Sequence, residues 1–111
     1  MANISALQDI KKVANGKNAV LVAISKTQSV EAIRTIYDAG QRIFGENKVQ
    51  ELVPKYEVLP KDIEWHMVGT LQSNKVKYIA PFISLIHSVD SLKLAIEINK
   101  QALKNKRIID V

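Results

Sequence analysis

The chain has 111 residues, of which 47% are hydrophobic and 24% charged, a composition typical of one folded domain and unlike that of a disordered chain. It has no cysteine, which excludes disulfides and thiolate metal sites. The amino terminus lacks the apolar core of a signal peptide, and no apolar run approaches membrane-spanning length, so we expect a cytoplasmic protein without a membrane partner.

The formal net charge of +5 raises the question of nucleic-acid binding, because basic surfaces attract phosphate backbones. The lysines, however, are spread along the chain without a dense block or interleaved aromatic residues that could stack on bases. The distribution therefore predicts a solvated basic surface and no nucleic-acid partner.

Helix and strand patterns alternate through the first part of the chain. An amphipathic helix is expected over residues 4–14, followed by an apolar strand at 19–24. A second helix should begin after Ser29, a typical N-cap residue, and end at Gly40. A short strand follows at 42–44.

The next helix has an apolar stripe from Val49 to Tyr56 and contains Pro54. A proline inside a helix costs about 3 kcal/mol, so we expect a kink or a helix in two pieces. A strand is expected at 64–68.

Two more helices and two more strands complete the pattern. The strands are expected at 84–87 and, as the beginning of a fifth strand, at 107–111. The shorter helix should end before Pro81. Candidate N-caps of the two helices are Ser73 or Asn74 for the first and Asp90 or Ser91 for the second.

This alternation predicts an α/β fold built of successive βα units of a parallel sheet. A five-stranded doubly wound sheet closes within this length, whereas a (β/α)8 barrel needs about 250 residues. On pattern alone the doubly wound sheet is favoured. Against the doubly wound sheet, the chain stops on an apolar strand with no following helix, which leaves the last βα unit looking cut off.

The apolar run at 19–24 ends two residues before Lys26. The carboxyl ends of parallel strands are where α/β proteins bind ligands, and a lysine partly withdrawn from water there can act as a nucleophile or form a Schiff base. Most lysines just past a strand are simply solvated. Taken alone, Lys26 is open to both interpretations.

Other polar residues follow or end the predicted strands. His66 and His87 could be acids, bases or hydrogen-bonded core residues, and neither has metal-ligand spacing. Glu46 and Asp90 are explained as a first-turn helix charge and a cap. No glycine-rich phosphate loop and no nucleophile elbow occur. The residues that should meet Lys26 at the strand ends are Asn47, Gly69 and Ser88.

Four segments resemble the pyridoxal phosphate homeostasis protein family, which is related in fold to the amino-terminal barrel of alanine racemase. They are Val22–Thr27, Phe44–Glu51, Trp65–Lys75 and Ile86–Ser91. They occur in order and span essentially the whole chain. The resemblance implies that residues 1–111 form a single partial domain, the amino-terminal half of a (β/α)8 TIM-type barrel truncated in the fifth strand.

The resemblance further implies pyridoxal 5'-phosphate (PLP) held as a Schiff base on Lys26, with Asn47 and His66 near the cofactor. It implies a carrier in vitamin B6 homeostasis rather than an enzyme, with no catalytic residue. Binding by this chain should be weak, because the family's phosphate-binding loops follow late strands. An incomplete barrel should form a homo-oligomer or need a complementing carboxyl-terminal half.

Two other functions stay open at this point. One is a PLP-dependent enzyme of the amino-acid racemase type, although no tyrosine or carboxylate stands obviously after a strand as an acid or base. The other is a basic module that binds nucleic acid or a partner protein.

Overall fold

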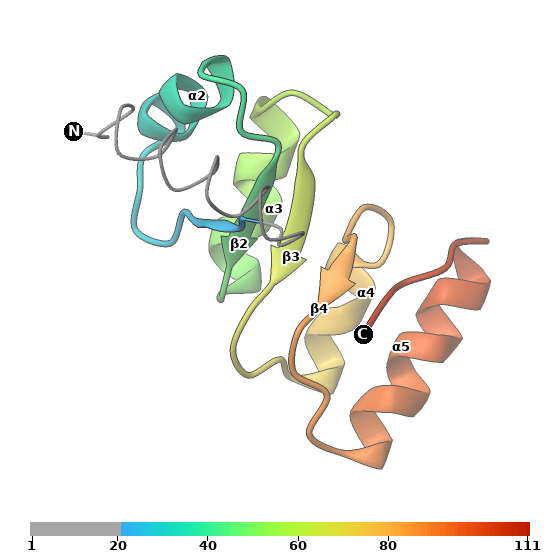
Figure 1. The fold of residues 1–111 in the computed structure, drawn as a ribbon. Coiled ribbons are helices and arrows are strands. Elements are labelled where there is room, and N and C mark those ends of the chain that lie inside the picture. The colour runs from blue at the N-terminus through green and yellow to red at the C-terminus, as the bar shows by residue number, and fades with distance from the viewer. Residues whose placement is uncertain (1–20) are drawn as a thin grey trace.

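The computed structural model describes residues 21–111, which form one parallel sheet of four strands in the order β1-β2-β3-β4 (Figure 1). The expected helix at 4–14 and the start of the expected strand at 19–24 lie outside the described residues. The strands are β1 (Ala23–Ile24), β2 (Ile43–Glu46), β3 (Glu64–Met67) and β4 (Leu85–Ile86).

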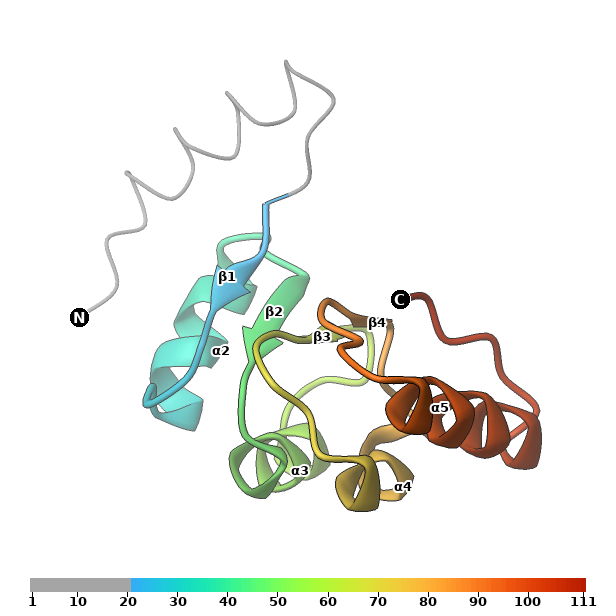
Figure 2. The same cartoon turned by 90° about the horizontal axis from the view of Figure 1, so that it is seen from below.

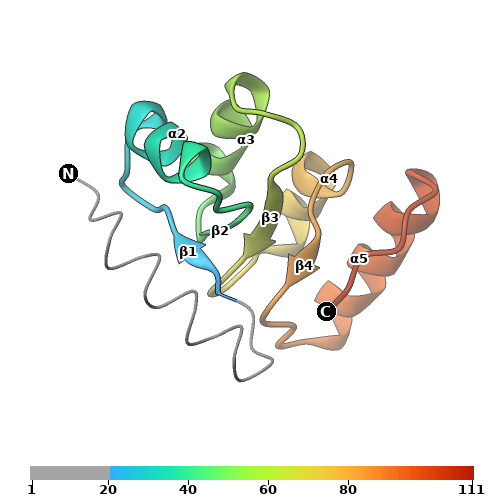
Figure 3. The ribbon, with the colours of Figure 1, turned by 45° about the horizontal axis from the view of Figure 1, so that its top comes forward.

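A helix follows each of these strands. The helices are α2 (Val30–Asp38), α3 (Val49–Val58), α4 (Val76–Ile79) after a short 3-10 turn η1 (Ser73–Lys75), and α5 (Leu92–Lys104). All four α-helices lie along the same, outer side of the curved sheet (Figures 2 and 3). No helix among residues 21–111 is long and apolar enough to span a bilayer.

The sheet is wound in chain order, as in the wall of a β/α barrel. A doubly wound sheet would reverse its strand order at a switch point and carry helices on both faces. The preference for a doubly wound sheet is therefore wrong, and the barrel-like winding implied by the family resemblance is confirmed. The apolar pattern could not decide this, because it reports which residues are buried and not in which direction the chain winds.

The core lies between the sheet and the helices. On the sheet side, the register aligns Phe44 with Trp65, and their ring centroids are 5.9 Å apart. Both rings are almost completely buried. The helices contribute a matching set of buried apolar side chains, among them Ile33, Leu52, Ile79 and Leu94. This packing fixes the position of each strand end relative to the strands beside it.

The residues that cap the helix starts agree in part with those predicted from the sequence. Ser29 Oγ accepts a hydrogen bond from Ala32 N, and Ser91 Oγ accepts one from Leu94 N, both at 3.1 Å. Ser91, and not Asp90, therefore caps α5. The expected cap at Ser73 or Asn74 is wrong, because those two residues lie inside η1, which begins without a side-chain cap.

Pro54 does not divide its helix. α3 runs from Val49 to Val58 as one helix, so the expected break into two pieces is not observed. Leu52 and Lys55 are both buried against the sheet on either side of the proline. These buried side chains hold both halves of the helix in place although one backbone donor is missing.

The expected fifth strand is represented by a single bridge. Asp110 pairs in parallel with Leu85, and its carbonyl accepts a hydrogen bond of 2.9 Å from Ile86 N. The segment thus lies beside β4 in the place of the next strand of the sheet.

Candidate functional site

Lys26 lies in a tight turn just beyond β1. Ser25 N donates to Gly45 O (2.9 Å), which continues the pairing with β2, and Gln28 N donates to Ser25 O (3.0 Å), which closes the turn. Thr27 has a φ of +63°, in the left-handed region. Lys26 itself is exposed, so the described residues do not withdraw it from water as the nucleophile interpretation supposed.

Buried polar side chains hold this turn from the helix side of the sheet. Lys55 Nζ, on α3, lies 2.9 Å from Ser25 O and 2.9 Å from Glu46 Oε2. Ser25 Oγ donates to the same Glu46 carboxylate. All three residues are at most 7% exposed, and we call Ser25, Glu46 and Lys55 the anchor cluster.

The sequence interpretation missed the anchor cluster. Glu46 is the last residue of β2 and is fully buried and paired with Lys55, so its assignment as a first-turn helix charge is wrong. One signal was available. Lys55 follows the buried Leu52 by three residues, which places both side chains on the same face of α3.

Asn47 directly follows β2 at the same edge of the sheet. It is half-buried, and its Oδ1 atom is buried without a hydrogen-bond partner among the described residues. Gly69, with a φ of +77°, lies beside it, and a Cβ at Gly69 would be 3.7 Å from Asn47 Cβ. A buried amide oxygen without a partner is able to accept a hydrogen bond from a polar ligand.

A cavity of about 350 Å³ borders Asn47. Its wall includes Lys48 and Gln50 from the start of α3 and Thr70 and Lys75 from the segment after β3. Polar and basic side chains therefore surround the space next to Asn47.

His66 lies in β3, opposite Gly45 in the register, and is 9% exposed. Its Nδ1 atom is 3.0 Å from Nε2 of His87, which follows β4. Burial, and then the neighbouring His87, lower the pKa of His66 below its ordinary value, against a smaller opposite effect of Glu64. His66 is therefore a neutral imidazole near pH 7, with one ring nitrogen able to donate and the other to accept.

Gly45 lies between its neighbours with little space to spare. A Cβ atom there would come within 3.0 Å of Ile24 Cδ1, 3.1 Å of Val22 Cγ1 and 3.3 Å of Val68 Cγ1. These side chains belong to the face of the sheet turned away from the helices, where Ile24 is 51% exposed. The missing side chain lets the strand ends on this face approach each other closely.

The structure thus places Lys26, Asn47 and His66 at the carboxyl ends of three adjacent strands. No hydrogen bond joins any two of them among residues 21–111, so they share an edge without forming a cluster of their own. In the same part of the chain, no group of three His, Asp or Glu could hold a metal ion.

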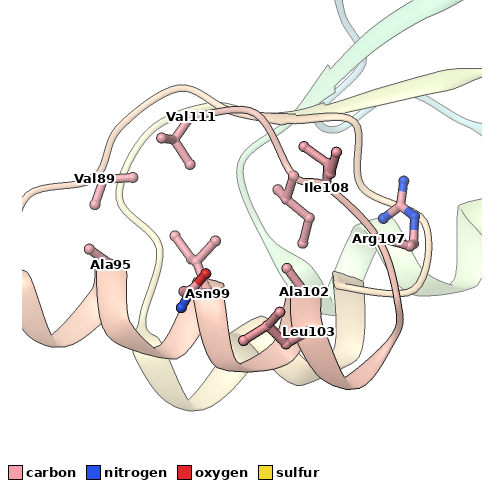
Figure 4. Close-up of a pocket in the computed structure, with 10 residues that line it drawn as sticks. Val89, Ala95, Asn99, Ala102, Leu103, Arg107, Ile108 and Val111 are labelled. Carbon is pink, nitrogen blue, oxygen red and sulfur yellow. The ribbon is translucent and has the colours of Figure 1, made fainter.

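A second cavity lies elsewhere in the molecule. It measures about 340 Å³ and is lined mainly by apolar side chains of α5 and residues 107–111, including Ala102, Leu103, Ile108 and Val111 (Figure 4). None of the three candidate residues lines it.

Similar sequences occur among curated proteins. The chain is 48% identical over 103 residues to the pyridoxal phosphate homeostasis protein of Aquifex aeolicus, a match that covers 91% of this chain and 45% of that protein. It is 47% identical over 92 residues to the protein of that name from Schizosaccharomyces pombe, covering 81% of this chain and 39% of that protein. No protein-family model matches the chain.

The chain is also similar to solved structures. PipY of Synechococcus elongatus PCC7942 without PLP superimposes with a TM-score of 0.85 at 39% identity, over 96% of this chain and 50% of PipY. The structure of PipY with PLP bound gives a TM-score of 0.71 over 87% of this chain and 49% of PipY.

The fold and the strand-end lysine define an α/β protein wound like the wall of a β/α barrel, with an amine at the edge where such proteins bind ligands. The matches over most of the chain make the assignment specific. The chain belongs to the pyridoxal phosphate homeostasis protein family. It spans about half the length of the curated relatives that it matches.

Proposed function

We propose that this chain is part of a PLP-binding protein that holds the cofactor as a Schiff base on Lys26 and serves PLP homeostasis without turnover. The observation that carries the proposal is the position of Lys26, in a hydrogen-bonded turn at the carboxyl end of β1. The PLP-bound structure of PipY, 39% identical to this chain, supports the choice of ligand.

The chemistry of the strand-end residues fits this cofactor. PLP carries an aldehyde, which condenses reversibly with a primary amine and releases water. Lys26 offers an exposed amine. Asn47 offers an amide whose buried oxygen has no partner among the described residues, and His66 offers a neutral imidazole.

Each of the three residues has a separate part in this proposal. The Lys26 amine binds covalently once it has lost its proton. Asn47 orients the ligand through its amide, which can both donate and accept. His66, bonded to His87, donates or accepts one hydrogen bond and stays uncharged near pH 7.

The surroundings of Lys26 support a carrier rather than an enzyme. A racemase or decarboxylase needs an acid or base positioned over the α-carbon of its substrate. Glu46, the carboxylate at the end of β2, is fully buried and bonded to Lys55 and Ser25. Glu46 is therefore not available as an acid or base for a substrate at this edge of the sheet. Turnover of amino acids would favour the alternative of a PLP-dependent racemase-type enzyme.

We also propose that residues 1–111 act as one barrel-wall unit that associates with a second copy or with a complementing half. Apolar side chains support this, since Ile24 is 51% exposed on the sheet and Ile108 is 89% exposed in the segment that follows α5. Size-exclusion chromatography with light scattering tests the proposal. A stable, folded monomer with no affinity for a complementing half would contradict it.

Covalent trapping tests the main proposal. The chain, alone and completed to the length of its relatives, is mixed with PLP and reduced with borohydride, and the labelled peptide is mapped by mass spectrometry. We expect label on Lys26, more in the completed protein. Lys26→Ala should abolish the label, whereas Lys100→Ala, at another exposed lysine, should not. Label confined to other lysines in the completed protein would refute the proposal.

The same variant separates the proposal from the interaction-module alternative. A salt-sensitive complex with RNA that forms equally well with Lys26→Ala would favour that alternative.

A further inference from the structure

We infer that Lys55 is a positioning residue: it fixes the peptide group that precedes Lys26 and thereby sets the direction in which the Lys26 side chain leaves the sheet. This inference rests on the proposed function, in which Lys26 is the residue that binds the cofactor.

The contact that carries the inference is between Lys55 and the backbone. Lys55 Nζ lies 2.9 Å from Ser25 O, the carbonyl of the peptide group that contains Lys26 N. Because a peptide group is planar, a bond that holds this oxygen also orients the Lys26 N–Cα bond. The same oxygen accepts from Gln28 N at 3.0 Å, so Lys55 also supports the turn closure.

The peptide group on the other side of Lys26 is held by the same helix. Thr27 N donates to Glu51 Oε1 at 3.3 Å. Glu51 and Lys55 are four residues apart and therefore lie on one face of α3. The two peptide groups that flank the Lys26 Cα atom are thus each bonded to a side chain of α3, which restricts the backbone angles of Lys26 from both sides.

Stability alone does not explain why an ion pair is buried here. Glu46 is fully buried and Lys55 is 7% exposed, so both charges lose most of their hydration. A buried ion pair often stabilises a fold no more than apolar side chains of similar size would. An apolar pair, however, could not donate a hydrogen bond to Ser25 O. A lysine is needed at this position because its hydrogen bond to Ser25 O holds the turn.

The backbone at Thr27 also requires support. Its φ of +63° is unfavourable for a β-branched residue, and such conformations persist where surrounding contacts enforce them. Lys55 on one side and Glu51 on the other supply those contacts.

The first experiment compares Lys55→Met with Lys100→Met, a matched change of an exposed lysine in the middle of α5. Hydrogen–deuterium exchange at the amides of Thr27 and Gln28 measures the turn directly and needs no cofactor. We expect faster exchange there in Lys55→Met and not in Lys100→Met. The rate at which PLP and borohydride label Lys26 should fall on the order of tenfold to a hundredfold in Lys55→Met alone.

A second variant separates positioning from general stability. Glu46→Leu combined with Lys55→Met replaces the ion pair by apolar side chains and should restore the melting temperature. Ser25 O still lacks its lysine donor, so exchange at the turn should stay fast and labelling of Lys26 slow. Glu51→Ala, which removes the acceptor for Thr27 N and leaves the buried pair intact, should loosen the turn from the other side.

The outcomes distinguish the two proposals. Wild-type exchange and labelling in the double variant, or in a folded Lys55→Met, would overturn the positioning role while leaving the proposed function intact. If the wild-type protein is not labelled on Lys26, the proposed function fails, and the exchange measurements still decide whether Lys55 holds the turn. If Lys55→Met does not fold, the double variant carries the test.

Discussion

His66 Nδ1 lies 3.0 Å from His87 Nε2, so a ring in β3 is bonded to a ring just past β4. Such a contact needs a hydrogen on one nitrogen and a lone pair on the other. Burial lowers the pKa of His66, and this ring is therefore neutral near pH 7.

We expect the free energy of unfolding to decrease as the pH falls below about 6.5, the ordinary pKa of histidine. Between this value and the lower pKa of folded His66, the unfolded chain binds more protons than the folded one. The contribution of His66 to the free energy of unfolding is complete above about pH 6.5 and is lost as the pH falls through this range. Denaturant titrations followed by Trp65 fluorescence measure it. The slope should be smaller in His66→Gln, and an unchanged slope would contradict the assignment.

Asp62 makes polar contacts at the opposite edge of the sheet, where the strands begin. It accepts a hydrogen bond of 2.6 Å from Tyr37 and lies 3.2 Å from Arg42 Nε. The Tyr37 hydroxyl is the main cause that lowers the pKa of Asp62. We expect Asp62→Asn to lower the melting temperature slightly and to leave labelling of Lys26 unchanged, because these residues precede β2 and β3. A loss of labelling at unchanged stability would contradict this separation.

Gly45→Ala should destabilise the fold by about 1 to 3 kcal/mol through overpacking. The added methyl group would meet Ile24 Cδ1 at 3.0 Å. Shortening that neighbour should make room, so Ile24→Ala combined with Gly45→Ala should be less destabilised than the two single changes add up to. Thermal unfolding of the four proteins gives the coupling energy, and strict additivity would show that the two sites are independent.

Ser91→Ala should cost about 1 kcal/mol, because it removes the acceptor for Leu94 N at the start of α5. Asp90→Ala is the matched control and should cost much less, since Ser91 provides the cap. Chemical denaturation of both variants measures the difference. Equal losses would mean that Asp90 shares the capping role.

The sequence predicted the features that depend on neighbours along the chain. The helix cap at Ser29 and the position of Lys26 just beyond β1 follow from local patterns, and the structure confirms them. The local pattern left Asp90 and Ser91 open as the cap of α5, and the structure shows that it is Ser91. Contacts across strands could not be predicted in this way. The bond between His66 and His87 depends on the register of β3 and β4.

The anchor cluster escaped prediction for a related reason. A lysine in an amphipathic helix is usually solvated, and only the packing of α3 against β2 and the turn after β1 shows that Lys55 is buried. Likewise, the apolar pattern of the strands was the same for a doubly wound sheet as for a barrel wall. The observed strand order was needed to distinguish them.

The order of the strands has a consequence for how the protein forms. Paired residues in neighbouring strands are only about twenty positions apart in the chain, so each pairing closes a short loop at a small entropic cost. The turn that carries Lys26 is held entirely by residues up to Lys55. During synthesis from the amino terminus, Lys26 can therefore reach its final backbone conformation before β3 and β4 have left the ribosome.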